Sequence, residues 1–202
     1  MHNEHDIHDH HAQMQLAARE KTYFGFWVYL LTDLLIFATL FACYVILKNN
    51  TFGGEGAGKL FSLPYALTET MILLVSSFTS GLGAIAAHKK NLAQVYIWYG
   101  ITFVLGLAFL YMEVSEFARM FAEGNGFQRS GFLSAFFTLV GTHGLHITVG
   151  AFWMLCMFIY LMRRGLTQPA INKLTLLSVF WHFLDLVWIF IFTVVYLFGG
   201  VI

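Results

Sequence analysis

Residues 178–196 read Ser-Val-Phe-Trp-His-Phe-Leu-Asp-Leu-Val-Trp-Ile-Phe-Ile-Phe-Thr-Val-Val-Tyr. The run is long and apolar enough to cross a bilayer as a helix, which needs about 20 residues at ~1.5 Å each. It nevertheless carries His182 and Asp185 near its middle, at i and i+3, and therefore on one helix face. Insertion scales put the cost of one charge at that depth at roughly 2.5–3.5 kcal/mol. The stretch therefore predicts a transmembrane helix whose polar face lies against protein, water or lipid headgroups.

The composition of the whole chain extends this prediction. Of 202 residues, 58% are hydrophobic and only 11% are Asp, Glu, Lys or Arg, against about 25% charged residues in soluble domains. Cys43 and Cys156 both lie inside apolar runs, which indicates small core residues rather than a disulfide framework. The net charge is zero, so nothing suggests nucleic acid as a partner. We expect an all-α, polytopic membrane bundle that forms one domain.

Apolar runs divide the chain into five predicted spans. A polar tail, residues 1–22, precedes a transmembrane domain over residues 23–202, and we expect the tail to be disordered and cytoplasmic. The spans are predicted at about 24–47, 66–87, 95–117, 132–162 and 174–198. The tail carries five histidines, and it is either a metal-binding arm or a solvated segment that is rich in His. Those histidines are His2, His5, His8, His10 and His11.

Small residues recur at four-residue spacing along the second span. Such a ridge lets helix backbones approach closely within lipid. Its members are Ser76, Ser77, Ser80, Gly81 and Ala84. The connection at 88–91 is short, so we expect the second and third spans to form an antiparallel hairpin.

Lysine and arginine set the predicted orientation. With the N-terminus inside, seven basic residues fall on inner segments and four on outer ones, as the positive-inside rule favours. The seven are Arg19, Lys21, Lys89, Lys90, Arg163, Arg164 and Lys173, and the four are Lys48, Lys59, Arg119 and Arg129. We therefore expect a cytoplasmic N-terminus and a periplasmic C-terminus.

Ionisable residues inside the spans form the candidate site. Asp33 lies at a depth similar to His182 and Asp185, so the first and fifth spans are expected to share one polar layer. Toward the outer side, the sequence places Glu69, Glu113 and Glu116. His143 and His146 lie near the centre of the fourth span, on one helix face.

Three interpretations of these residues remain open. Di-metal centres in bundles use Glu-x-x-His on two helices, and this chain has no such motif. Intramembrane acids and histidines also mark proton relays, although no Pro breaks these spans as it does in many transporter sites. The third interpretation is that the polar groups bond one another, hold the helices in register and contact lipid.

The chain resembles subunit III of the haem–copper oxidases in two long motifs. They are Arg129-Ser-Gly-Phe-Leu-Ser-Ala-Phe-Phe-Thr-Leu-Val-Gly-Thr-His-Gly-Leu-His146 and Trp181-His-Phe-Leu-Asp-Leu-Val-Trp188. Shorter matches are Phe24-Gly-Phe-Trp-Val-Tyr-Leu, Glu116-Phe and Arg164-Gly-Leu-Thr. The likeness runs from Phe24 to Gly200 with the spacing kept. Five spans match the short form of the family, which is found in bacterial ubiquinol oxidases.

The resemblance implies an accessory role. Oxidases of this kind take electrons from ubiquinol, reduce oxygen to water and pump protons across the bacterial inner membrane. Haem and copper are expected in the catalytic subunit I, with no cofactor, metal or catalytic residue in this chain. The implied partners are subunit I, other oxidase subunits and phospholipids. The alternatives are a small proton-coupled carrier, or subunit III of a cytochrome c or menaquinol oxidase.

The resemblance also covers the candidate residues. Asp33 stands where cytochrome c oxidase relatives usually carry Glu, and it matches an acid that faces a lipid-holding cleft. Other intramembrane polar positions of the family are matched by Glu116, His143, His146, His182 and Asp185.

Overall fold

A computed structural model describes residues 2–51 and 62–201 of the protein. Within these residues the secondary structure is helical throughout, without a strand. Five helices are long and apolar enough to cross a membrane. Their ranges are Arg19–Leu47, Leu63–His88, Leu92–Ala122, Gly131–Arg164 and Gln168–Leu197. The predicted all-α, polytopic membrane fold is confirmed, and the predicted Gly-rich loop and Lys59 lie outside the described residues.

Helix α1 (His2–Leu47) contains the first predicted span and extends far before it. Residues 2–22 are helical here, where we expected a disordered tail. The tail has no Pro, and the first Gly is Gly25, so no residue interrupts the helical backbone. The chain divides into two compact units, Met1–Ile36 and Phe37–Ile202.

The second and third spans form the predicted hairpin. Helix α3 (Leu63–His88) has Pro64 in its first turn, where the missing N–H costs nothing. Helix α4 (Leu92–Ala122) follows after a three-residue turn, and the Asn91 side chain caps it by accepting from Gln94 N. Both helices start a few residues before the predicted spans because these caps lie outside the apolar runs.

The fourth and fifth spans form a second pair. Helix α5 (Gly131–Arg164) is capped by Ser130, whose side chain accepts from Leu133 N. It ends at Gly165, where a positive φ of 67° favours glycine. Helix α6 (Gln168–Ile191) then begins with Pro169 in its first turn.

A wide-turned segment, not predicted from the sequence, follows α6. Residues Phe192–Leu197 form a π-helix, η1, and a short helix α7 (Phe198–Val201) completes the described chain. π-helical turns are rare and recur at functional sites. Apolar periodicity alone does not reveal this change of helix type.

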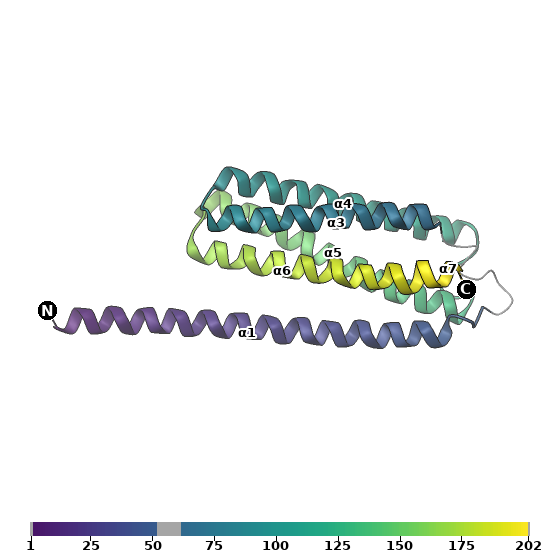
Figure 1. The fold of residues 1–202 in the computed structure, drawn as a ribbon, viewed down its shortest axis with the longest axis horizontal. Helices are drawn as coiled ribbons and strands as arrows, with labels where there is room; N and C mark the ends of the chain where they lie inside the picture. The colour runs from purple at the N-terminus through teal and green to yellow at the C-terminus, as the bar shows by residue number, and fades with distance from the viewer. Residues whose placement is uncertain (1, 52–61, 202) are drawn as a thin grey trace. The chain divides into compact units, whose positions relative to one another are not determined.

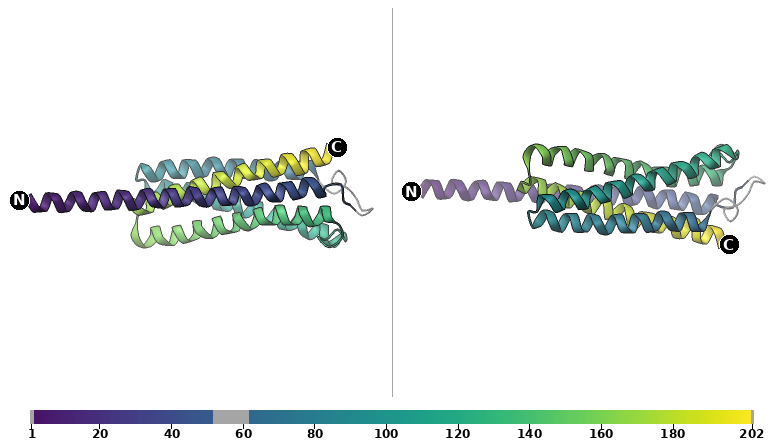
Figure 2. Two further views of the ribbon diagram at one scale, coloured as in Figure 1. Left: turned by 90° about the horizontal axis from the view of Figure 1, so that it is seen from below. Right: turned by 90° about the horizontal axis from the view of Figure 1, so that it is seen from above.

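Helices α3 to α6 run alongside one another in every view (Figures 1 and 2). The start of α3, the end of α4, the start of α5 and α7 all lie at the same end of this bundle. The C-terminal part of α1, which belongs to the second unit, packs through aromatic rings. Phe37 contacts His146, Phe41 contacts Phe190 and Tyr44 contacts Phe132.

Trp181 of α6 is the centre of the bundle. It is buried, and its indole Nε1 donates to Ser76 Oγ of α3 at 3.0 Å. A Cβ added to Gly106 of α4 would lie 2.8 Å from the same ring, and one added to Gly150 of α5 would lie 3.0 Å from it. Two helices therefore lack a side chain where this indole lies, and one ring joins four helices.

Candidate functional site

The interface between α3 and α6 is lined by paired polar side chains, which we call the α3–α6 seam. Ser80 bonds Ser178 at 3.2 Å between hydroxyl oxygens, and Trp188 Nε1 donates to Thr70 Oγ1 at 3.1 Å. Ser77 lies close enough to the Asp185 carboxyl to interact with it, while Asp185 Oδ1 meets no hydrogen-bond partner among the described residues. The seam comprises Thr70, Ser76, Ser77, Ser80 and Gly81 of α3 with Ser178, Trp181, His182, Asp185 and Trp188 of α6. The small-residue ridge predicted on the second span is therefore a helix-packing surface.

His182 lies at the outer edge of this seam. Its Nδ1 donates to the Ser178 carbonyl at 2.6 Å, which leaves Nε2 as an acceptor. Nε2 is 3.6 Å from where a Cβ on Gly81 would be, and the His182 side chain is exposed. Asp185, one turn on, is buried and interacts electrostatically with His182. The predicted His182–Asp185 pair thus has one member inside the bundle and one on its surface.

A second polar region contains the three glutamates Glu69, Glu113 and Glu116, which we call the acidic cluster. The structure brings these residues together from α3 and α4, as their predicted depth implies, because each carboxyl lies within electrostatic range of another. All three are buried. In the described part of the chain, no hydrogen-bond partner meets either carboxyl oxygen of Glu69 or of Glu113.

Tyr196 of η1 is the residue around which the acidic cluster gathers. Its buried hydroxyl donates to Glu116 Oε2 at 2.9 Å, and Glu69 and Glu113 both act on it electrostatically. Arg119 Nη2 lies 3.8 Å from Glu116 Oε1, but its side chain is 47% exposed, so this ion pair contributes little. Sequence reasoning did not select Tyr196, which stands in an apolar run. Only its place opposite the glutamates distinguishes it from other span-end aromatics.

Glu113 fits between α4 and α5 because position 144 is glycine. A Cβ on Gly144 would lie 2.6 Å from Glu113 Oε1 and 2.7 Å from Oε2. Any larger residue at 144 would displace the carboxyl. The Gly-Leu-His part of the fourth-span motif therefore includes the space that this carboxyl occupies.

His143 lies in an aromatic box. Its ring stacks on Trp188 at 5.2 Å between centroids and meets Phe109 and Phe37 edge-on at 6.0 and 6.2 Å. The residue is buried, and neither ring nitrogen has a hydrogen-bond partner among the described residues. His146, on the adjacent turn, is only partly buried and pairs Nδ1 with the Thr142 carbonyl at 2.7 Å. The two histidines therefore occupy different surroundings although they share one helix face.

Asp33 lies in the first compact unit. Tyr29, one turn earlier, hydrogen-bonds to its carboxyl. The predicted polar layer between Asp33 and the fifth span stays a prediction. Across residues 2–51 and 62–201, no group of three or more His, Cys, Asp or Glu side chains is arranged to hold a metal ion.

Five membrane-length helices with polar side chains buried between them define a polytopic membrane protein of the helix-bundle class. The sequence profile of cytochrome c oxidase subunit III matches residues 1–200, and the chain belongs to that family. The resemblance found in the two long motifs is therefore confirmed.

Individual relatives are similar over nearly their full lengths. The cytochrome bo(3) ubiquinol oxidase subunit 3 of Pseudomonas aeruginosa is 52% identical over 194 residues, covering 96% of this chain and 91% of the relative. Quinol oxidase subunit 3 of Bacillus subtilis is 45% identical over 175 residues, covering 87% and 86%. Cytochrome c oxidase subunit 3 of Bacillus sp. PS3 is 44% identical over 179 residues, covering 89% and 86%.

Proposed function

We propose that this chain is the third, non-catalytic subunit of a proton-pumping ubiquinol oxidase in the bacterial cytoplasmic membrane. In this role it stabilises the catalytic subunit I, which holds the haem and copper. The observation that carries the proposal is the family match over residues 1–200, together with relatives named as ubiquinol oxidase subunit 3. The N-terminus is cytoplasmic and the C-terminus periplasmic in this proposal, following the excess of Lys and Arg.

The choice of ubiquinol rests on the relatives. Two Pseudomonas proteins named as cytochrome bo(3) ubiquinol oxidase subunit 3 are 52% and 47% identical to this chain. A quinol oxidase subunit and a cytochrome c oxidase subunit, both from Bacillus, are 45% and 44% identical. The assignment to a ubiquinol oxidase follows the first pair, and the electron donor is tested by comparing ubiquinol with reduced cytochrome c.

The α3–α6 seam supports a packing role for the intramembrane polar groups. Most of its hydroxyl and indole groups bond across the interface, which is how polar residues hold helices together in lipid. The position of His182 supports the inference that another protein subunit packs against this face of α6. Its exposed ring lies in the middle of a span, and lipid tails offer no donor to an acceptor nitrogen. In this proposal a partner subunit covers His182, while phospholipids cover the apolar faces of the other helices.

Purification of a tagged chain from its native membrane tests the proposal. We expect haem and copper to co-purify with the chain, and ubiquinol to support oxygen consumption by the complex. Deleting the chain should increase the rate at which the oxidase loses activity while its haem content stays normal. Reduced cytochrome c as the better donor, or haem bound to the isolated chain, would contradict the assignment.

The acidic cluster favours one second candidate, a small proton-coupled carrier. Buried carboxyls inside a span are typical of proton relays, and four oxygens of Glu69 and Glu113 have no hydrogen-bond partner in the described part of the chain. Reconstituting the chain alone in vesicles separates the two candidates. A carrier would move protons under an imposed gradient, whereas an accessory subunit would leave the internal pH unchanged.

A further inference from the structure

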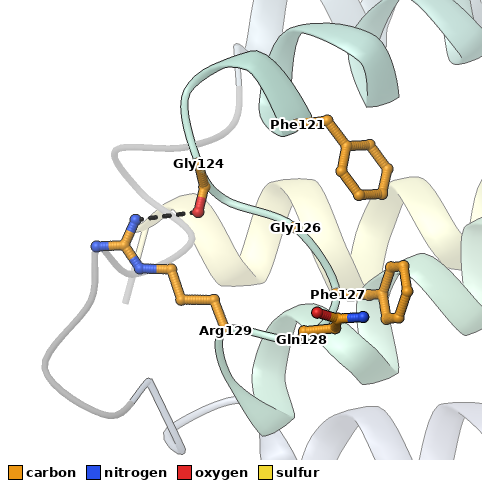
Figure 3. Close-up of a pocket in the computed structure, with 6 residues that line it drawn as sticks. All are labelled: Phe121, Gly124, Gly126, Phe127, Gln128 and Arg129. Carbon is orange, nitrogen blue, oxygen red and sulfur yellow. Dashed lines mark hydrogen bonds between the residues drawn. The ribbon is translucent and has the colours of Figure 1, made fainter.

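The turn between α4 and α5 borders an open hollow of about 380 Å³, which we call the α4–α5 pocket (Figure 3). Its lining residues are Phe121, Gly124, Gly126, Phe127, Gln128 and Arg129. The volume falls in the range of about 300–1,000 Å³ that small-molecule sites occupy. Since α4 ends at Ala122 and α5 begins at Gly131, the pocket lies at the end of two helices that are each long enough to cross a membrane. Where such helices leave a bilayer, hydrocarbon gives way to lipid headgroups.

Arg129 provides a positive charge to this pocket. Its Nη1 donates to Asn125 Oδ1 at 2.6 Å and to the Gly124 carbonyl at 3.4 Å. Both bonds use the same nitrogen, so Nε and Nη2 have no partner in residues 2–51 and 62–201, and no carboxylate there is paired with this arginine. Among the described residues, the guanidinium is thus bonded through one edge only.

Apolar surface and further donors complete the lining. Phe121 and Phe127 pack edge to face at 6.0 Å between ring centroids, yet they remain 49% and 46% exposed. The backbone N–H groups of Phe127 and Gln128 meet no backbone acceptor in the described chain. Figure 3 shows Arg129 on one side of the turn and the two phenyl rings on the other, with the Gln128 amide near Phe127. One wall of the pocket is cationic and the other aromatic.

We propose that the α4–α5 pocket binds the phosphodiester of an anionic phospholipid from the leaflet at this end of the bundle. The planar guanidinium suits two phosphate oxygens at once. The phenyl rings lie at the depth where aromatic side chains anchor membrane proteins, and they contact the glycerol and the first acyl carbons. This site is separate from the lipid-facing acid that the resemblance assigns to Asp33. It requires only that the chain spans a membrane, so it does not depend on the proposed oxidase function.

Photolabelling of the intact complex tests this site. The complex is placed in nanodiscs that contain a phosphatidylglycerol with a diazirine next to its headgroup, and labelled peptides are mapped by mass spectrometry. We expect labelling of residues 121–129, and about tenfold less in Arg129→Gln, the loss expected for one charge-assisted bond. Lys48→Gln is the matched control, because it removes one exposed positive charge at the same end of the bundle and outside the pocket.

Three other labelling results would contradict the proposed lipid site. Equal labelling of Arg129→Gln and the parent would overturn the proposal, as would labelling abolished by millimolar glycerol phosphate, which would indicate a soluble phosphate as the ligand. Labelling that is absent from the complex but present after a neighbouring subunit is stripped off would show a protein contact instead. If Arg129→Gln does not fold, the Arg129→Lys variant tests the site instead. It keeps the charge without the planar fork, and labelling between that of the parent and background supports the site.

Discussion

The α3–α6 seam and the acidic cluster are both buried, polar and within the membrane, but their hydrogen bonding differs. In the seam, hydroxyl and indole groups pair across two helices, as Ser80 does with Ser178 and Trp181 with Ser76. In the acidic cluster, the described residues offer one hydrogen bond, from Tyr196 to Glu116, to three carboxyls. Satisfied polar groups cost little to bury, while unsatisfied ones cost about 1–3 kcal/mol each. The seam therefore contributes to stability, and the cluster is retained at the expense of stability.

The most severe way to break the seam is to remove its central ring. Trp181→Ala leaves a large cavity between the glycines of α4 and α5 and leaves Ser76 without its donor. We expect a loss of about 3–5 kcal/mol in unfolding free energy, measured as a fall in the detergent melting temperature of the purified complex. A matched control is Trp153→Ala, a partly buried tryptophan on α5, which should cost much less. Equal losses would show that position 181 has no special role.

Asp185 tests the polar side of the seam. Asp185→Leu removes the carboxyl that interacts with Ser77 and with His182. We expect a loss of about 1–3 kcal/mol, read from the same melting curve, while haem content stays normal. An unchanged melting profile would contradict a stabilising polar interface.

Tyr196 links the cluster to the last helix. Tyr196→Phe keeps the ring and removes only the hydroxyl that donates to Glu116 Oε2. We expect a loss of about 1 kcal/mol, again from thermal unfolding. The control is Tyr111→Phe, at an exposed tyrosine, which should change nothing. A destabilisation as large as that of Trp181→Ala would mean that the ring itself had shifted.

Substitution of Glu113 is expected to change the melting temperature least, and it contrasts most clearly with substitution of Asp185. Its two oxygens have no hydrogen-bond partner among the described residues, so Glu113→Leu replaces an unsatisfied group by an apolar one of similar size. Such exchanges are nearly neutral or stabilising, and we expect a melting temperature equal to or above that of the parent. A clear destabilisation would show that the carboxyl is satisfied in the membrane and that the contrast with Asp185→Leu is false.

The sequence predicted the spans because apolar length is a local property. It also predicted the ridge of α3, since four-residue spacing implies one helix face, and Ser76 and Ser80 do bond residues of α6. The depth of Glu69, Glu113 and Glu116 along their helices was enough to place them in one region.

Other features depend on tertiary placement. Trp181 looks like any other aromatic of an apolar run until Gly106 and Gly150 are known to face it. Tyr196 was missed for the same reason, because its partner Glu116 lies 80 residues away. The helical backbone before residue 22 differs from the expected disorder, since polar composition alone does not distinguish a solvated helix from a coil.

The π-helix after α6 has a consequence for the angular positions of the last side chains. An α-helix advances about 100° per residue, so Trp188 and Tyr196, eight positions apart, would face directions about 80° apart. The wider i→i+5 turns of Phe192–Leu197 advance less per residue, and the two rings come to lie 6.2 Å apart. A single helix can thus serve the aromatic box around His143 and, two turns later, the glutamates. The π-turns thus bring Tyr196 onto the helix face that the acidic cluster occupies, and converting Phe192–Leu197 to regular α-helix without changing its length would rotate Tyr196 away from Glu116.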